Sequence, residues 1–469
     1  MVHLNVFIEI NGKQTEVGKI FGSDYSDACF AYNGEYMDSD IGEPISISLP
    51  FQSDAFSPEQ TKSYFESLLP EGFSRRAVAG WVRADERDYI TILKELGREC
   101  LGAVRISEVR DSGKNKDEEN KLLEPGDKGG NEKSAGQKKN YKGKVLGSQE
   151  VDVEESVGHK KYEKLSLNEV KALAAEGATK STRILMETHL SLTGASGKVG
   201  LFYDAENDTW YLPKGEAPSS HIVKQSHVRL EKIILNEQLC MMTARTCDIP
   251  VCDSFIINLG KGKDDEVLYA TQRYDRLMGQ GEMVDGMKSP IRLHQEDFAQ
   301  ALGIKPAEKY EKEKSGYLSR MFGLVQDYCT NPIEDKKQLL EMVIFSYLIG
   351  NTDCHVKNFS LLYSSDLKSV RLAPAYDIVA TQVYHSTPEM SFYIGNEIII
   401  SQINRSDFVD VANEIGLGRT MVEKTFDSVA MKFEGALKKA TDELKQMGYK
   451  DAVKIKKSIL ETGGYRNIL

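Results

Sequence analysis

The sequence lacks a long apolar segment: none of its apolar runs approaches the roughly 20 residues that a membrane-spanning helix needs. The first ten residues lack the basic start of a secretory signal peptide and carry polar side chains within their apolar run. The seven cysteines form no Cys-x-x-Cys pair, which favours buried, reduced thiols over a zinc site. Cys354, in a polar stretch, is the candidate for an exposed thiol. Together these absences predict a cytoplasmic protein without membrane contact.

The sequence also lacks an excess of positive charge. Its formal net charge of −11 argues against charge-driven binding of nucleic acid, and no helix-turn-helix segment is evident. Any DNA is therefore expected to be bound by a separate partner. The phosphate-binding pattern Gly-x-x-x-x-Gly-Lys-Ser/Thr is absent. The composition, 40% hydrophobic and 28% charged, is that of a globular protein, and a length of 469 residues predicts two or three domains.

The first hundred residues show the patterns of a small domain. Residues 4–10 alternate apolar and polar side chains and end at Asn11-Gly12, which predicts a β-hairpin. Ser57, followed three residues later by Gln60, predicts the capping box of a helix. Further elements are predicted as a strand at 44–50, a helix at 85–96 and a strand at 102–106. Together they predict an α+β domain over residues 1–110.

A charged stretch then interrupts the chain. Residues 111–162 hold few strongly apolar side chains in their first part, which predicts a disordered linker or insertion. Ordered structure is predicted to resume at Ser166, which forms a capping box with Glu169. A mixed sheet is predicted over 163–277, followed by a mostly helical part over 278–469.

Three helical segments are predicted in this last part. The first begins near Arg292, the second covers residues 335–349, and the third begins at Ser406 with breaks at Gly416 and Gly448. A mixed sheet followed by a helical lobe is the two-lobed layout of protein kinases.

The stretch from Leu348 to Leu362 carries the most informative pattern. It ends an apolar helix, turns through polar residues and continues into an apolar run that predicts a strand. Asp353 precedes Asn358 by five positions, and Asp377 follows later. In protein kinases, an Asp in this position receives the proton of the substrate hydroxyl, and the Asn and the later Asp bind Mg²⁺. The spacing predicts phosphoryl transfer with these three residues in those roles.

Two side chains flank the predicted proton acceptor. His355 and Lys357 are candidates to touch the transferring phosphate. Two other interpretations compete: a polar turn that only caps a helix end, and a metal-dependent hydrolase that uses Asp353, His355 and Asp377 as ligands. The order Asp, Asn, Asp after a Gly-rich turn and a strand lysine favours kinase chemistry, and oxygen ligands favour magnesium over zinc.

Segments upstream predict a nucleotide site. The small-residue turn Gly194-Ala195-Ser196-Gly197-Lys198 lies between two strand-like runs and could place backbone N–H groups on phosphate oxygens, although most such turns are only turns. Lys224 ends a short strand and is a candidate for the phosphates. Glu237, on the following helix, is placed to pair with it, although a solvated lysine and glutamate are the plain alternative.

A fourth segment lies at the end of the predicted sheet. Gln272-Arg273-Tyr274-Asp275 stands where a kinase hinge would present its backbone to adenine. A strand end closed by salt bridges explains the same residues equally well.

Taken together, these segments resemble the HipA-type serine/threonine kinases, the toxin halves of bacterial type II toxin–antitoxin systems. The resemblance covers nearly the whole chain outside residues 108–160. It rests on motifs that follow one another in order: Leu49-Pro50, Leu68–Gly72, Leu96–Ala103, Leu190–Ala195, His221–Lys224, Asn236-Glu237, Arg273–Arg276, His294–Phe298, Gly350–Phe359 and Leu372–Asp377.

The resemblance implies an α+β, two-lobed kinase-like core with a small N-terminal subdomain, and ATP and Mg²⁺ as cofactors. It implies the same roles for the catalytic and metal-binding residues named above, with Lys224 on the phosphates and Gln272–Asp275 around the adenosine. It also implies autophosphorylation of Ser191, which would eject the Gly-rich segment and switch the kinase off. A phosphoserine adds nearly two negative charges and can dock a loop on basic groups. A structural serine in a turn is the alternative.

The resemblance also implies partners. A small helix-turn-helix antitoxin, HipB-like, would bind operator DNA, so that DNA is reached only indirectly. The substrates would be proteins of translation, such as an aminoacyl-tRNA synthetase. The predicted function is an ATP- and Mg²⁺-dependent serine/threonine protein kinase that arrests growth as a toxin. The alternative is a nucleotide-binding module with weak or no catalysis that acts as a co-repressor with the antitoxin.

Overall fold

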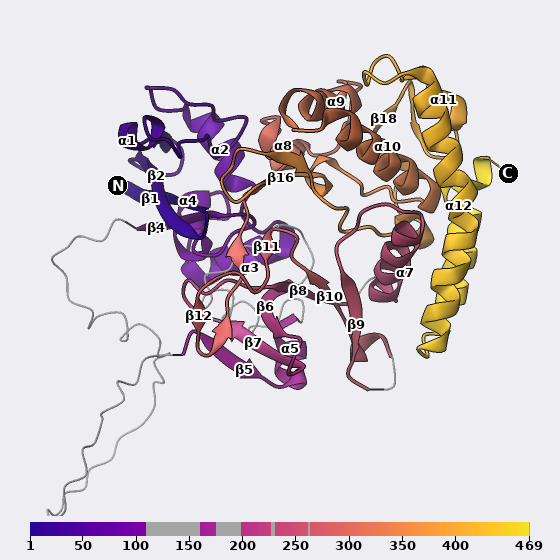
Figure 1. Ribbon diagram of the computed structural model, residues 1–469, viewed down its shortest axis with the longest axis horizontal. Coiled ribbons are helices and arrows are strands. Elements are labelled where there is room, and N and C mark those ends of the chain that lie inside the picture. Colours follow the sequence, from indigo (N-terminus) through magenta and orange to yellow (C-terminus); the bar gives the residue numbers. More distant parts are fainter. Residues whose placement is uncertain (109–159, 175–197, 227–229, 261–262, 469) are drawn as a thin grey trace, which may run out of the picture. The chain divides into compact units, whose positions relative to one another are not determined.

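The computed structural model (Figure 1) describes residues 1–108, 160–174, 198–226, 230–260 and 263–468. Three predicted features lie outside the described residues: the linker up to residue 159, the turn Gly194–Gly197, and Ser191.

The N-terminal region is an antiparallel sheet of four strands, in the order β3-β2-β1-β4, with helices beside it (Figure 1). The strands are β1 (Val2–Ile10), β2 (Lys13–Gly22), β3 (Cys29–Tyr32) and β4 (Val104–Glu108). The helices are α1 (Gly34–Met37), α2 (Pro58–Glu66), α3 (Gly72–Val82) and α4 (Tyr89–Leu96). The predicted hairpin is confirmed: Asn11 and Gly12 have φ values of 48° and 76°, in the left-handed region that two-residue hairpin turns need.

The predicted capping box of α2 is also confirmed, since Ser57 and Gln60 cap each other's backbone N–H groups. The predicted helix at 85–96 is shorter than expected because Asp88 caps its first turn, so that it begins at Tyr89. Helix α3 was not predicted.

The strand predicted at 44–50 is wrong. This segment has no strand partner, and its polar backbone groups bond instead to side chains from other elements. The Ile45 N–H donates to the Tyr32 hydroxyl (2.9 Å), and the Ile45 carbonyl accepts from Tyr64 (3.2 Å). The Ile47 N–H donates to Glu296 (3.1 Å). The alternation of apolar residues therefore reflects burial of an irregular segment.

A six-stranded antiparallel sheet follows, in the order β5-β7-β6-β8-β10-β9. Its strands are β5 (Tyr162–Leu165), β6 (Lys198–Asp204), β7 (Thr209–Pro213), β8 (His221–Gln225), β9 (Ser254–Asn258) and β10 (Val267–Gln272). Two helices accompany it, α5 (Leu167–Ala174) and α7 (Ile233–Thr246). The predicted capping box at the start of α5 is confirmed by the hydrogen bonds between Ser166 and Glu169.

The C-terminal part combines short strands with long helices. Its strands are β11 (Arg276–Leu277), β12 (Met283–Val284), β13 (Met287–Lys288), β14 (Ile291–Arg292), β15 (Gln295–Asp297), β16 (Ser360–Tyr363), β17 (Val370–Leu372), β18 (Glu389–Ile394) and β19 (Glu397–Ile399). Its helices are α8 (Phe298–Ala301), α9 (Tyr317–Tyr328), α10 (Pro332–Ile349), α11 (Arg405–Asp410), α12 (Arg419–Gln446) and α13 (Ala452–Thr462). Single 3₁₀ turns lie at Asp264–Glu266, Pro306–Glu308, Val356–Asn358, Thr381–Tyr384 and Gly464–Asn467.

The start predicted for the helix near Arg292 is wrong, because the helix begins only at Phe298. Residues 295–297 pair with β16 as strand β15, and only the single-turn helix α8 follows. The strand at 360–363, the helix over 335–349 and the C-terminal helices are confirmed. The breaks fall at Gly416 and Gly448, whose φ values of 63° and 101° suit glycine. The domain boundaries stay a prediction.

Helix α10 is the centre of the C-terminal core. Most of its side chains from Leu339 to Ile349 are buried, on all sides of the helix, as expected for a helix enclosed by protein. Helix α12, yellow in Figure 1, contacts both α10 and α7. The end of α10 is thereby fixed, and the loop that follows it starts from a rigid base.

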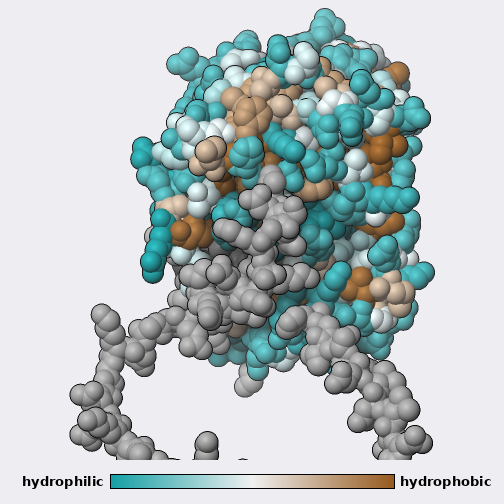
Figure 2. Space-filling model, turned by 90° about the vertical axis from the view of Figure 1, so that its left-hand side faces the viewer, coloured by the Kyte–Doolittle hydropathy of each residue, from teal (hydrophilic) through white to brown (hydrophobic). Residues whose placement is uncertain are grey.

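The described residues on the face shown in Figure 2 are largely polar. On the face shown in Figure 2, hydrophilic side chains (teal) predominate over small hydrophobic groups (brown) among the coloured atoms. Within the described ranges, no helix has the length and apolar character needed to cross a membrane. The expectation of an exposed Cys354 is wrong, because this side chain is 2% exposed and burial raises its thiol pKa to about 12.

Candidate active site

The predicted catalytic loop begins where α10 ends at Gly350, which has a left-handed backbone (φ 76°). The side-chain oxygen of Asn351 accepts a hydrogen bond from the Asp353 N–H (3.1 Å). The Asn358 side-chain Nδ2 donates to the Asp353 carbonyl (2.8 Å). Asp353 and Asn358 are thereby held in one tight turn, which explains why their spacing in the sequence is informative.

Lys224, on β8, is the charge centre of the site. Its Nζ lies 2.7 Å from Glu237 Oε1, on α7, and 2.5 Å from Asp377 Oδ1. The expected contact between Lys224 and Glu237 is present, so the solvated-lysine alternative is wrong. Burial alone would lower the pKa of Lys224, but the two carboxylates raise it above its ordinary value. The lysine is therefore a buried cation at neutral pH.

Asp377 and Lys198 complete this charge group. Asp377 has a φ of 54°, a left-handed conformation that Asp tolerates better than most residues. Burial alone would raise the pKa of Asp377, but Lys224 and Lys198 lower it below its usual range. Burial lowers the pKa of Lys198, on β6, to about 8, with Asp377 opposing this shift and Lys224 adding to it. Asp377 is thus a carboxylate at neutral pH.

The carboxylate of Asp353 meets a tyrosine that the sequence did not point to. Its Oδ1 accepts a short hydrogen bond from the hydroxyl of Tyr310. Burial raises the pKa of Asp353, and this hydrogen bond opposes the shift. Tyr310 lies 43 positions earlier in the chain, and no motif marks it.

His355 lies beside the same pair. Its ring packs edge-on against Tyr310, with centroids 5.1 Å apart, and its Nε2 lies 4.0 Å from Asp353 Oδ1. Burial lowers the pKa of His355 to about 3, so that the imidazole is neutral at pH 7. His355 therefore offers polarity beside Asp353 and no positive charge.

Lys357 points toward the N-terminal region. Its Nζ lies 2.7 Å from Asp297 Oδ2 and 4.0 Å from Glu71 Oε1. Glu71 also pairs with Lys309 (2.7 Å). Burial alone would raise the pKa of Glu71, but Lys357 and Lys309 lower it. Glu71 is a further site residue that was not predicted, although it lies within one of the resemblance motifs, Leu68–Gly72.

These side chains line one pocket of about 370 Å³, within the range of small-molecule sites. Every predicted site residue among the described residues lines it: Lys198, Lys224, Glu237, Gln272, Arg273, Tyr274, Asp275, Asp353, His355, Lys357, Asn358 and Asp377. The tyrosines Tyr274 and Tyr376 stack on each other at its edge, with centroids 5.3 Å apart. Apolar lining comes from Leu101, Ile222, Ile234 and Val379.

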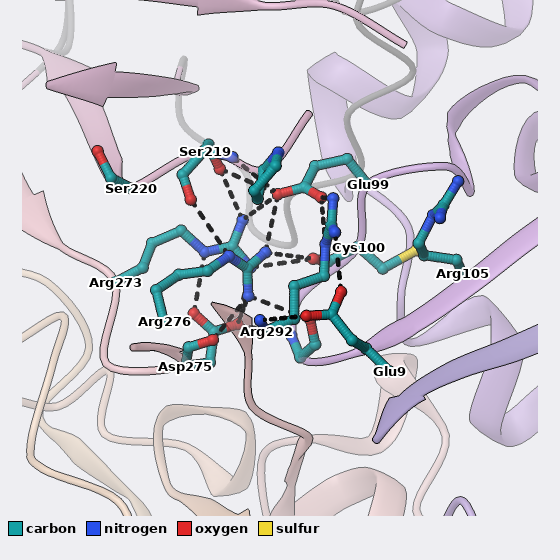
Figure 3. A network of polar contacts seen from close by, with 12 residues as sticks. Glu9, Glu99, Cys100, Arg105, Ser219, Ser220, Arg273, Asp275, Arg276 and Arg292 are labelled. Carbon is teal, nitrogen blue, oxygen red and sulfur yellow. Dashed lines mark hydrogen bonds and ion pairs between the residues drawn. The ribbon is translucent and has the colours of Figure 1, made fainter. Parts of the chain in front are cut away.

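Two backbone N–H groups of the segment Gln272–Asp275 already donate hydrogen bonds within the protein. The N–H groups of Gln272 and Arg273 donate to the carbonyls of Asp253 (2.8 Å) and Ser220 (2.9 Å). An adenine ring would therefore have to use other backbone groups of this segment. The side chains of Arg273 and Asp275 join a buried network, which Figure 3 shows.

We call this network the arginine cluster; it consists of Arg273, Arg276, Arg292, Glu9, Glu99 and Asp275 (Figure 3). Glu99 is its centre: Oε1 lies 2.8 Å from Arg276 and 3.2 Å from Arg273, and Oε2 lies 2.5 Å from Arg292. Burial alone would raise the pKa of Glu99, but the three arginines lower it far below its ordinary value. The cluster contains three cations and three anions, so its charges balance.

The arginine cluster joins the N-terminal region to the pocket. Glu9 and Glu99 come from the N-terminal region, and the Gly102 N–H donates to Asp275 (2.6 Å). A strand end closed by salt bridges is one interpretation of this segment from the sequence alone, and for Arg273 and Asp275 that interpretation is confirmed. Since both residues also line the pocket, the N-terminal region directly supports one of its walls.

A six-stranded antiparallel sheet with a paired lysine and glutamate, followed by a helical part with an Asp–Asn–Asp set, defines a protein-kinase-like fold. Residues 8–107 match the model of the HipA N-terminal domain, and residues 190–437 match that of the HipA-like C-terminal domain. The second match alone covers more than half of the chain. The protein belongs to the HipA family.

Curated relatives agree with this assignment. The protein named "Putative kinase Y4mE" of Sinorhizobium fredii is 27% identical over 87% of this chain and 85% of its own length. The serine/threonine-protein kinase toxin HipA of Shewanella oneidensis is 25% identical over 53% of this chain and 56% of its own length. At the level of the family, the protein is therefore a kinase.

A solved structure shows the same fold. It is described as the Shewanella oneidensis MR-1 toxin–antitoxin system HipA, HipB and its operator DNA in complex. The similarity has a TM-score of 0.70 at 18% identity and covers 98% of this chain and 97% of that chain. The predicted kinase-like α+β fold is confirmed.

Proposed function

We propose that this protein is an ATP- and Mg²⁺-dependent serine/threonine protein kinase. The observation that carries the proposal is the position of Lys224, whose Nζ lies 2.7 Å from Glu237 and 2.5 Å from Asp377 in the pocket that also holds Asp353. In active protein kinases, a strand lysine paired with a helix glutamate stands beside the metal-binding Asp. Relatives named as kinases support the same class.

Asp353 would act as the proton acceptor. Its carboxylate already accepts a hydrogen bond from a hydroxyl group, that of Tyr310, which is the contact a substrate serine or threonine needs. The neutral imidazole of His355 would hold a polar position beside it, whereas Lys357 already pairs with Asp297 and Glu71 and would reach the phosphate only by leaving them. These roles remain predictions.

The donor atoms fit Mg²⁺. Asn358 uses its Nδ2 in the bond to Asp353, which leaves its carbonyl oxygen as a donor, and Asp377 supplies a carboxylate. Mg²⁺ is often bound by one or two protein oxygens, with phosphates and waters completing its shell. ATP phosphates and waters would supply the remaining ligands at Asn358 and Asp377. Bound Mg²⁺ would neutralise charge on the phosphates.

The pocket also suits ATP. The apolar lining of Leu101 and Ile222, together with Tyr274, would receive the adenosine, and Lys224 and Lys198 would face the phosphates. The phosphate contacts of Gly194–Gly197 and the autophosphorylation of Ser191 concern residues outside the described ranges and stay predictions.

Family membership supports a wider biological role. We infer that the kinase arrests growth as the toxin of a toxin–antitoxin pair by phosphorylating a protein of translation, such as an aminoacyl-tRNA synthetase. We also infer that a small HipB-like antitoxin binds it and contacts the DNA. The support is the Shewanella HipA, which is named a kinase toxin, and the solved assembly of HipA with HipB and operator DNA.

The test is phosphoryl transfer from radiolabelled ATP with Mg²⁺ to the protein itself and to cell lysate. We expect Asp353→Asn to lower transfer by about 10²–10⁴-fold, because it removes the proton acceptor. Glu206→Gln, at an exposed position of the β6–β7 turn, is the matched control. Binding of a fluorescent ATP analogue should stay unchanged in both variants, which shows that the pocket is intact.

The outcomes separate the two candidate functions. Transfer by the wild type that Asp353→Asn abolishes supports the kinase. ATP binding without any transfer would contradict it and favour the nucleotide-binding co-repressor module. Equal growth arrest on expression of wild type and Asp353→Asn would show that toxicity does not depend on phosphoryl transfer.

A further inference from the structure

Tyr310 stands at the position where the acceptor substrate has to arrive. Its hydroxyl donates to Oδ1 of Asp353, the proposed proton acceptor. A serine or threonine hydroxyl poised for transfer would donate a hydrogen bond to the same carboxylate. Tyr310 therefore makes, from within the chain, the contact that a substrate hydroxyl would make.

The backbone around Tyr310 is anchored on its N-terminal side. Lys309 forms a largely buried pair with Glu71 (2.7 Å), and Lys305, four residues earlier, adds an exposed and therefore weak contact to Glu59 (2.6 Å) on α2. Glu59 and Glu71 both belong to the N-terminal region. This region therefore holds the segment that carries Tyr310.

The backbone is anchored equally well on the other side. The Glu311 carboxylate is 3% exposed and accepts from the N–H groups of Ser315 (2.6 Å), Tyr317 (3.1 Å) and Tyr393 (2.9 Å). The Glu311 N–H donates to the Ser391 carbonyl (2.9 Å). With both neighbours held by these contacts, the backbone that carries the Tyr310 ring is fixed in place.

The side chain itself can still leave. Tyr310 is 39% exposed, and its ring contacts His355 by the edge while Lys309 lies over its face at 5.6 Å. Lys309, Glu71 and Asp377 also act on the pKa of Asp353, with Lys309 lowering it and the two carboxylates raising it. A change of the Tyr310 rotamer would free the carboxylate without moving the backbone.

We propose that Tyr310 is a placeholder, a side chain that occupies the place of the substrate hydroxyl in the site. This proposal rests on the proposed kinase function. Its hydroxyl occupies Asp353 until the hydroxyl of the protein substrate displaces it. The anchored segment 305–311 then forms part of the surface that receives the substrate. Tyr310 thereby raises the substrate concentration needed for transfer.

The test compares wild type with Tyr310→Phe, which keeps the ring on His355 and removes the hydroxyl. Tyr328→Phe, at a tyrosine that is 49% exposed, is the matched control. With myelin basic protein as a general serine/threonine acceptor, we expect the KM of Tyr310→Phe for this protein to fall about ten-fold, as for the loss of a competing hydrogen bond to a charged group. The kcat should stay within about two-fold, and the control should match the wild type.

A second measurement does not depend on activity. Carbodiimide-coupled labelling with glycine ethyl ester, read by mass spectrometry, reports the accessibility of each carboxylate. We expect faster labelling of Asp353 in Tyr310→Phe and unchanged labelling of Asp427 at the surface.

Several results would overturn the placeholder. Unchanged KM and unchanged labelling would show that the hydroxyl does not occupy Asp353. A fall in kcat at constant KM would show that Tyr310 orients Asp353 for catalysis. Phosphate found on Tyr310 would make it an acceptor in its own right. If the wild type transfers no phosphate at all, the kinase proposal fails, and the labelling alone decides whether the Tyr310 hydroxyl occupies one oxygen of the Asp353 carboxylate.

Discussion

Two groups of charged side chains contribute to the walls of the pocket, and they differ in how completely their charges are paired. In the arginine cluster, three arginines face three carboxylates, and Glu99 alone contacts all three guanidinium groups. In the pocket, Lys224 is shared between Glu237 and Asp377, and Asp377 has a side chain that is 40% exposed. The cluster is complete without a ligand, whereas the pocket keeps a carboxylate within reach of one.

Ion pairing therefore serves two purposes in this protein. In the arginine cluster it stabilises the fold, and in the pocket it prepares a site for a ligand. Removing charges from water is costly, so a closed group must match every charge with good geometry. In a ligand site, by contrast, some charges must stay incompletely paired so that the ligand can pair with them. We expect loss of a cluster residue to appear in stability and loss of a pocket residue to appear in activity, and the following predictions test that expectation.

Glu99→Gln should have the largest effect on stability. It leaves the arginines of the cluster with too few anions, and breaking a buried ion pair from one side costs about 3–5 kcal/mol. Urea denaturation should show a loss of this size in the free energy of unfolding. The exposed Glu206→Gln is the control, and a loss below about 1 kcal/mol would contradict a structural role for the cluster.

Lys224→Met should affect activity more than stability. It removes the cation that faces the phosphates, and loss of one such stabilising group typically lowers kcat by about 10²–10³-fold. The loss in stability should be smaller than for Glu99→Gln, because Asp377 reaches solvent and burial raises the pKa of Glu237, which favours its neutral form once the lysine is gone. A variant that unfolds more readily than Glu99→Gln would erase the distinction between the two groups.

Acid should destabilise the junction beside the cluster through His294. Its Nε2 lies 2.8 Å from the Ile45 carbonyl, and burial lowers its pKa from 6.5 to about 4. The unfolded chain takes up a proton below pH 6.5 and the folded one does not, so stability falls as the pH drops from 6.5 toward 4. The loss at pH 5 should be about 2 kcal/mol for this group.

The measurement is urea denaturation at pH 7 and pH 5. His294→Gln keeps a donor for Ile45 and removes the titrating ring, so its loss of stability between the two values should be smaller than that of the wild type. The exposed His3→Gln is the control. An equal loss in His294→Gln and wild type would show that other groups govern the acid response.

The smallest effect is expected at a surface pair. Arg405 contacts Asp427 through two hydrogen bonds of 2.6 Å and 2.8 Å between α11 and α12, but both side chains are about half exposed. Exposed ion pairs contribute roughly 0–1 kcal/mol. Asp427→Asn should therefore change the free energy of unfolding by less than 1 kcal/mol. A cost equal to that of Glu99→Gln would show that burial is not what distinguishes the cluster.

The parts of the fold that the sequence predicted well are those set by neighbouring residues. The turn at Asn11-Gly12 and the capping boxes at Ser57 and Ser166 depend on contacts within about four positions. The close pair of Asp353 and Asn358 belongs here too, since one turn holds both. Such features need no knowledge of the rest of the chain.

The errors arose where distant contacts override local pattern. Residues 44–50 alternate like a strand, but side chains of Tyr32, Tyr64 and Glu296 satisfy their backbone groups. Gln295–Asp297 has a pattern that is compatible with a helix, but it pairs with β16. Tyr310 was missed because nothing in its own neighbourhood relates it to Asp353.

By itself, the sequence determined the kinase-like order of motifs and the residue types that carry charge in the pocket, because short spacings and chemical type are written in the chain. Only the tertiary structure decided which charges meet. It showed that Arg273 and Asp275 close a balanced cluster with Glu99, that Asp377 joins the predicted pair of Lys224 and Glu237, and that the Tyr310 hydroxyl donates to Asp353. The physical reason is that ion pairing and burial depend on distances between residues far apart in the chain, which only packing fixes.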